Sequence, residues 1–120
     1  MIVLDASAVL AFLQGEPGAD RVEELLPVAS IGAANWSEVA QKVQARGGDW
    51  QLAVGLLTSH GLKVEPVTAE DGETAAAFWH RGDGLSLGDR LCLALAQRLT
   101  VIALTADRAW GDRDGVEQLR

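Results

Sequence analysis

Apolar residues follow two alternating patterns along this chain: short unbroken runs, and longer stretches with an apolar residue every three or four positions. The unbroken runs are typical of strands buried on both faces. They predict strands at 2–4, 28–31, 63–67 and 101–104, with a weak edge strand near 116–119. The periodic stretches predict helices over 7–13, 19–26, 36–46, 49–59, 69–79 and 86–99, and a short last helix over 105–110. Such alternation predicts an α/β fold, an α/β/α sandwich around a central parallel sheet.

Two of these helices carry specific expectations. Asn35 is expected to cap the third helix, which places Glu38 in its first turn. In the fourth helix, Leu52, Leu56 and Leu57 are expected to face the core. Both expectations bear on which side chains are free for function.

Composition narrows the class of protein. The 120 residues are 48% hydrophobic and 22% charged, which fits one domain over residues 1–120. The single cysteine, Cys92, cannot form an internal disulfide, so a reducing cytoplasm is expected. No apolar stretch approaches the length of a membrane span, so no membrane anchor is expected.

Four acidic residues stand where parallel strands end. Asp5 follows the first strand, Asp107 follows the strand at 101–104, and Glu38 begins the helix after the second strand. Asp89 opens a helix that leads directly into the strand at 101–104, so it lies at that strand's far, carboxyl end. Ligands of open parallel sheets bind at this edge, so the four carboxylates are candidate catalytic groups.

Each acid also has a purely structural explanation. Carboxylates are favoured near helix N-termini, and both Asn35-x-x-Glu38 and Ser86-x-x-Asp89 resemble capping boxes. Capping does not require four acids on one edge, however, and their repulsion needs an opposing charge. Oxygen ligands without histidine or thiolate clusters indicate Mg²⁺ or Mn²⁺, and hence phosphodiester hydrolysis.

The expected roles follow from that chemistry. Asp5, Asp89 and Asp107 are predicted metal ligands, and Glu38 is either a further ligand or the group that orients the attacking water. Ser7 and Thr105 are expected to hold the carboxylates by hydrogen bonds. The formal net charge of −7 opposes diffuse attraction to RNA, unless cations offset it locally, and it favours a basic protein partner.

The order of these motifs resembles the PIN-domain ribonucleases, in particular the VapC-type toxins of toxin–antitoxin pairs. The resemblance spans nearly the whole chain. It is carried by the segments Ile2-Val3-Leu4-Asp5-Ala6-Ser7-Ala8, Trp36-Ser37-Glu38-Val39, Leu85-Ser86-Leu87-Gly88-Asp89-Arg90-Leu91-Cys92-Leu93-Ala94 and Leu104-Thr105-Ala106-Asp107-Arg108-Ala109-Trp110. It implies a Mg²⁺-dependent endoribonuclease, homodimeric, inhibited by an antitoxin whose C-terminal segment occupies the active-site groove. Gly88 departs from the family, where alanine is more usual.

Two alternatives remain at this point. A phosphatase or receiver-type phosphoryl-transfer domain also places an aspartate after its first strand, but Ser7 and Thr105 stand where those classes would have an acid and a lysine. A non-catalytic interaction module of the same fold would be favoured by the loss of one acid, and none is lost.

Several other residues are of types that can contact RNA or cap helices. Arg81, Arg90 and Arg108 are expected either to contact phosphate or to pair with nearby carboxylates. His60 and His80 are expected to cap helix ends, and Trp110 is a candidate for the border of an RNA groove.

Overall fold

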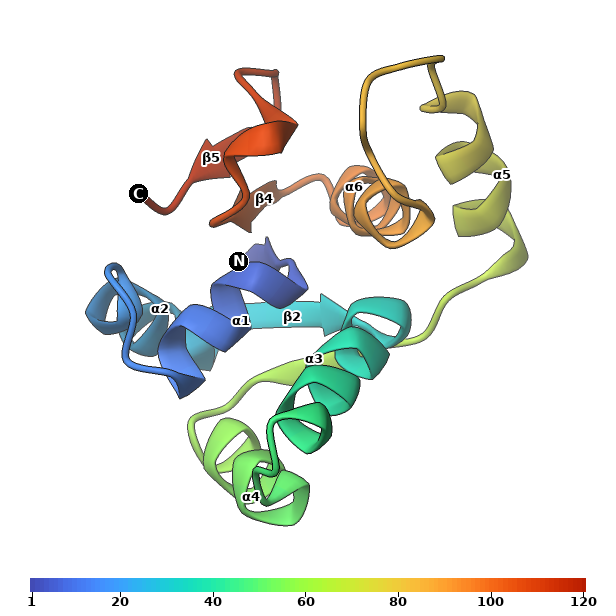
Figure 1. The fold of residues 1–120 in the computed structure, drawn as a ribbon. Coiled ribbons are helices and arrows are strands. Elements are labelled where there is room, and N and C mark those ends of the chain that lie inside the picture. Colours follow the sequence, from blue (N-terminus) through green and yellow to red (C-terminus); the bar gives the residue numbers. More distant parts are fainter.

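A sheet of five parallel strands forms the centre of the computed structural model, which describes residues 1–120 (Figure 1). The strands lie in the order β3-β2-β1-β4-β5. Their bounds are β1 (Ile2–Leu4), β2 (Ala29–Gly32), β3 (Lys63–Glu65), β4 (Ile102–Thr105) and β5 (Val116–Gln118). The α/β class is confirmed, including the edge strand β5. No helix has both the length and the apolar character that a bilayer crossing requires.

Helices cover both faces of the sheet (Figure 1). Their bounds are α1 (Ala6–Leu13), α2 (Ala19–Leu25), α3 (Ala33–Ala45), α4 (Trp50–Ser59), α5 (Ala69–Ala77) and α6 (Leu87–Leu99), with short 3₁₀ turns η1 (Leu26–Val28) and η2 (Arg108–Trp110). Most predicted elements are therefore correct to within two or three residues. The exception is the last helix, which is only the single turn η2.

The unbroken apolar runs reflect burial on both faces. Successive strand residues point to opposite faces, so Ile2 and Leu4 pack with α1 and α2, whereas Val3 packs against α6. In β4, Leu104 joins the first cluster and Ala103 the second. In β1 neither face meets water and no polar residue interrupts the run, whereas the partly exposed edge strand β3 carries Lys63 and Glu65.

The start of α3 differs from the prediction. The helix begins at Ala33, directly after β2, and Gly32 is its N-cap with an extended backbone and no side-chain hydrogen bond. Asn35 is therefore the third helical residue rather than the cap, and Glu38 lies in the second turn. The expected Asn35-x-x-Glu38 capping box was wrong, because the Asn35 side chain is buried between α3 and α6.

The prediction that three leucines of α4 face the core was only partly right. Leu57 is fully buried, but Leu52 is 72% exposed and Leu56 is 42% exposed. The helix packs at the periphery, on α3, so only a narrow face of it reaches the core (Figure 1). The two exposed leucines line an apolar hollow of about 300 Å³ together with Leu13 and Val43.

An ion pair joins α5 to α6. Arg98 donates from Nε and Nη2 to the two carboxylate oxygens of Asp71, at 2.9 and 3.1 Å. Asp71 also closes a capping box with Thr68 at the start of α5. Hydrogen bonds from Arg98 hold the pKa of Asp71 below its usual value, in spite of burial. The charged form of Asp71 is thus the one that stabilises the fold.

We predict that Asp71→Asn lowers the free energy of unfolding by about 1–2 kcal/mol at pH 7, because it removes a charge-assisted pair. The pKa of Asp71 is depressed in the fold, so its contribution is present at neutral pH and is lost as the pH falls below about 4. Urea unfolding of wild type and Asp71→Asn at several pH values between 7 and about 3 measures their difference in unfolding free energy, which should shrink as the pH falls. Glu73→Gln, at an exposed position of α5, serves as the control, and equal stability of wild type and Asp71→Asn at pH 7 would contradict the prediction.

Candidate functional site

The candidate site lies where the chain leaves the carboxyl ends of β1 and β4. These strands are neighbours in the sheet, but β1 is followed by β2 on one side and β4 by β5 on the other. Such a reversal is a topological switch point, and the region outside the strand ends there, termed the crevice, is where α/β proteins bind ligands. The backbone N–H of Asp5 donates to Leu104 O at 3.1 Å, which fixes the two strand ends side by side.

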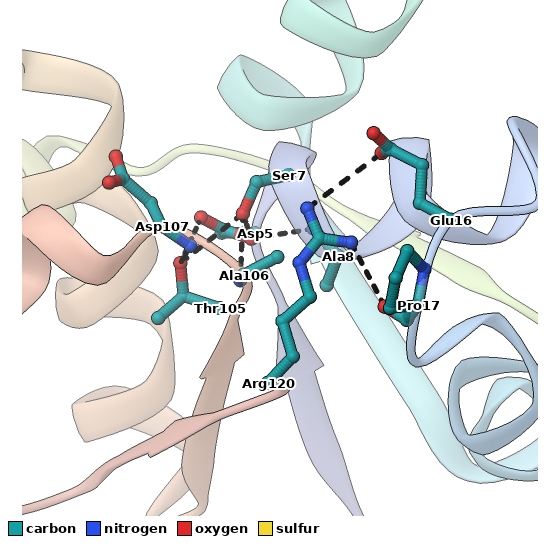
Figure 2. Close-up of polar contacts among 9 residues, drawn as sticks. All are labelled: Asp5, Ser7, Ala8, Glu16, Pro17, Thr105, Ala106, Asp107 and Arg120. Carbon is teal, nitrogen blue, oxygen red and sulfur yellow. Dashed lines mark hydrogen bonds and ion pairs between the residues drawn. The ribbon is translucent and has the colours of Figure 1, made fainter.

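Asp5 lies at the carboxyl end of β1, beside the end of β4 (Figure 2). Its exposed fraction is only 3%. Its Oδ1 accepts hydrogen bonds from Ser7 Oγ at 2.7 Å and from Ala8 N at 2.9 Å. Its Oδ2 accepts from Thr105 Oγ1 at 2.7 Å. Ser7 Oγ in turn accepts from the backbone N–H of Ala106 at 2.9 Å. The two hydroxyls therefore join the start of α1 to the end of β4 and orient the carboxylate, as expected for Ser7 and Thr105.

Burial dominates the proton affinity of Asp5. It raises the pKa of Asp5 to about 6, although the hydrogen bonds from Thr105, Ala8 and Ser7 lower it and the Asp89 charge raises it further. No cation of the protein pairs with Asp5. A buried carboxylate without a counter-ion is costly, and a bound cation would remove that cost.

Asp107 is joined to the same network through its backbone. Its N–H donates to Thr105 Oγ1 at 3.0 Å, so one hydroxyl contacts both Asp5 and Asp107 (Figure 2). The Asp107 side chain is exposed and caps η2 by accepting from Ala109 N at 2.9 Å. Asp107 thus lies beside Asp5 but faces solvent.

Asp89 and Glu38 approach from α6 and α3. Asp89 forms the expected capping box with Ser86, in which Ser86 N donates to its Oδ2 at 3.0 Å. Glu38 Oε1 accepts from Asn35 Nδ2 at 3.2 Å. Burial and the Asp89 charge raise the pKa of Glu38, and the same Asp89 charge acts on Asp5. Asp89 therefore lies close enough to both Glu38 and Asp5 to repel each of them.

Three of the acids serve as helix caps, as the structural explanation anticipated: Asp5, Asp89 and Asp107. Capping does not use every carboxylate oxygen, however. Three oxygens accept no hydrogen bond from the protein: Glu38 Oε2, Asp89 Oδ1 and Asp107 Oδ2. These atoms remain available to a ligand that carries positive charge.

The donor set fits a hard divalent cation in part. All the donors are carboxylate oxygens, and burial of Asp5 without a counter-ion favours a cation nearby. No three acidic, histidine or cysteine side chains converge closely enough to enclose an ion directly. An ion such as Mg²⁺ usually keeps several waters and needs only one or two carboxylates from the protein, so this spacing is compatible with it.

Other residues singled out in the sequence lie away from the crevice or have structural contacts. Arg90 donates to Ala75 O at 3.0 Å and so belongs to the α5–α6 contact. Arg81 stacks on Trp79, 5.8 Å from its ring centre. His60 Nδ1 lies 2.8 Å from Leu56 O, as expected for a cap. Trp110 is buried against α6, so its expected place beside an RNA groove was wrong.

The chain matches the family model of the PIN domain over residues 2–116. It is 34% identical over 108 residues to Ribonuclease VapC42 from Mycobacterium tuberculosis (strain ATCC 25618 / H37Rv), which covers 80% of this chain and 82% of that protein. The VapC ribonuclease Mb2780c from Mycobacterium bovis gives the same identity and coverage.

Solved structures share the fold. A chain of a toxin–antitoxin complex from Klebsiella pneumoniae superposes with a TM-score of 0.80 at 19% identity and covers 100% of this chain and 98% of that one. The sarcin–ricin loop cleaving toxin VapC20 from Mycobacterium tuberculosis gives a TM-score of 0.69 at 21% identity and covers 96% of this chain and 92% of that one.

We predict that Asp5→Asn stabilises the protein in EDTA by about 2 kcal/mol at pH 7.5. The folded pKa of Asp5 is about 6 and its ordinary value is 3.8, so ionisation of Asp5 costs the wild type stability as the pH rises through this window. The gain in Asp5→Asn should accordingly fade below about pH 4. Urea unfolding at several pH values measures it. Asp107→Asn, which changes an exposed carboxylate, is the control, and an unstabilised Asp5→Asn would contradict the burial argument.

Proposed function

The chain belongs to the PIN-domain family as an endoribonuclease of the VapC toxin type, and we propose that it cuts RNA with Mg²⁺ or Mn²⁺ at the edge formed by Asp5, Glu38, Asp89 and Asp107. The observation that carries this assignment is the crevice between β1 and β4, where a buried, unpaired Asp5 meets the charge of Asp89. We further propose that residues 1–120 act as one nuclease domain.

Each side chain has a definite part in this proposal. Asp5, Asp89 and Asp107 would hold the cation, and Glu38 would either join them or orient the attacking water. When bound, the cation would acidify a water and offset negative charge on the phosphodiester in the transition state. Ser7 and Thr105 orient Asp5 by hydrogen bonds, so little rearrangement would be needed on binding.

The acidic edge also explains how an acidic protein would handle RNA. The formal net charge of −7 gives no general attraction to phosphate. Cations held at the crevice would reverse the charge there alone. The exposed Arg108 next to Asp107 would add a fixed positive charge for a neighbouring phosphate. RNA binding should therefore be local to the crevice and dependent on divalent ions.

The phosphatase and receiver alternatives are set aside because the family match spans nearly the whole chain. The non-catalytic module is disfavoured because none of the four acids is engaged in an ion pair that would explain it as structural. One carboxylate oxygen of each of Glu38, Asp89 and Asp107 accepts no hydrogen bond, and Asp5 is buried without a counter-ion.

An antitoxin is the partner that we propose. One relative in structure comes from a toxin–antitoxin complex, and an acidic surface suits a basic inhibitory segment. The apolar hollow between α1, α3 and α4, with Leu52 and Leu56 exposed, could bind apolar side chains of that partner.

We also propose that the protein is a cytoplasmic homodimer. Light scattering of the purified protein would measure the mass of the assembly.

We predict that the purified protein, free of antitoxin, cleaves RNA when Mg²⁺ or Mn²⁺ is added and that EDTA abolishes cleavage. Asp5→Asn and Asp89→Asn should each lower kcat by at least about 100-fold, since both would lose a predicted ligand of the cation. Gel analysis of a labelled RNA measures both effects. Glu73→Gln, at an exposed acid on α5, is the matched control. Cleavage that persists in EDTA and in both aspartate variants would refute the mechanism.

We predict that Leu52→Glu weakens inhibition by the cognate antitoxin by about tenfold or more, because a charge would enter an apolar contact. Titration of antitoxin into the cleavage assay measures this, with each variant normalised to its own uninhibited rate. Val67→Glu, which adds the same charge at another exposed apolar position, is the control. Equal inhibition of both variants would place the antitoxin elsewhere on the toxin.

A further inference from the structure

Asn35 connects two of the acidic elements. It projects from the first turn of α3 and is only 1% exposed. Its Nδ2 donates to Glu38 Oε1 at 3.2 Å and to the backbone oxygen of Gly88 at 3.1 Å. One amide group therefore ties the Glu38 carboxylate to the first turn of α6, one residue before Asp89.

The orientation of this amide follows from chemistry. Gly88 O is an acceptor, and so is the ionised Glu38 carboxylate, so only the NH₂ group of Asn35 can face both. The Oδ1 atom then points the other way, where it is buried and has no hydrogen-bond partner. It lies against the backbone of Gly32.

This arrangement is a poor way to build a core. A buried amide oxygen without a partner costs stability that an apolar side chain of the same shape would not. Asn35 nevertheless uses both of its donors on the acidic edge. The loss of stability caused by the unpaired Oδ1 atom indicates that Asn35 serves to hold Glu38 rather than to pack the core.

Gly88 supplies the second half of the arrangement. A β-carbon at Gly88 would overlap Glu38 Oε1, so the carboxylate occupies the space that any other residue would fill. Gly88 is also the second residue of α6, where alanine would favour the helix. Any other residue at position 88 would therefore require the Glu38 carboxylate to move.

We propose that Asn35 is a positioning residue which, with the bare α-carbon of Gly88, fixes the Glu38 carboxylate over the first turn of α6 beside Asp89. This inference rests on the proposed ribonuclease function, because it assigns Asn35 a task at that same site. It predicts that Asn35 acts only through Glu38 and only while residue 88 lacks a side chain.

The test compares wild type, Asn35→Leu, Gly88→Ala and the double variant, with Gln44→Leu on the exposed face of α3 as the control. Asn35→Leu keeps the shape and removes the donors. It should lower kcat roughly 10-fold to 100-fold with KM within about twofold, and weaken Mn²⁺ binding measured without RNA by a similar factor. Its unfolding midpoint in EDTA should equal or exceed that of wild type.

Gly88→Ala should fold at least as stably as wild type and lower kcat several-fold. When Asn35→Leu is added to Gly88→Ala, kcat should fall by less than a further factor of about two, because the Glu38 carboxylate is already displaced. Additive losses would overturn the coupling. Wild-type kcat and Mn²⁺ affinity in Asn35→Leu would overturn the positioning role, and so would a loss of activity explained by a lower unfolding midpoint.

The two proposals fail in different ways. A wild-type protein that cleaves no RNA refutes the ribonuclease assignment, whereas the Mn²⁺ affinities of the four variants still report whether Asn35 and Gly88 hold Glu38 in place. Active wild type with indifferent variants refutes only the role of Asn35.

Discussion

The pairing of β1 with β4 is the constraint on which the site depends. These two strands are distant in sequence, yet their register aligns Leu4 with Leu104 and so brings Asp5 next to Thr105. The Thr105 hydroxyl then donates to the buried Asp5 and accepts from the backbone of Asp107. Without this pairing the first and last acids would have no common neighbour, because local structure alone uses each of them only as a cap.

The ionised form of Asp5 lowers the stability of the fold in the absence of a ligand. Asp5 is held in place by hydrogen bonds, but burial and the Asp89 charge oppose its ionisation. Stability alone would favour a neutral side chain there. Active sites commonly retain such unfavourable groups, since the free energy that they cost is recovered when the proper ligand binds. The same reasoning applies to the buried amide oxygen of Asn35, which has no partner.

The C-terminal strand β5 and the two residues after it support the end of β4. Leu119 N donates to Thr105 O at 2.7 Å, so the pairing with β4 extends to the residue that contacts Asp5. Leu119 packs against Gly18, and Arg120 donates to Pro17 O at 2.9 Å (Figure 2). The end of the chain thus closes onto the α1–α2 connection, and the expected weak edge strand proves to be part of the support for the site.

The sequence by itself determined the α/β alternation and predicted the sheet edge on which Asp5, Glu38, Asp89 and Asp107 are placed, because strand and helix periodicities are local and parallel strands end on one side. It also predicted the Ser86–Asp89 capping box, which is a contact over three residues. Only the tertiary structure decided that Asn35 bridges to Gly88 instead of capping its helix, and that Leu52 and Leu56 face outward. Those outcomes depend on which elements pack together, and helical spacing marks an apolar face without saying what will cover it.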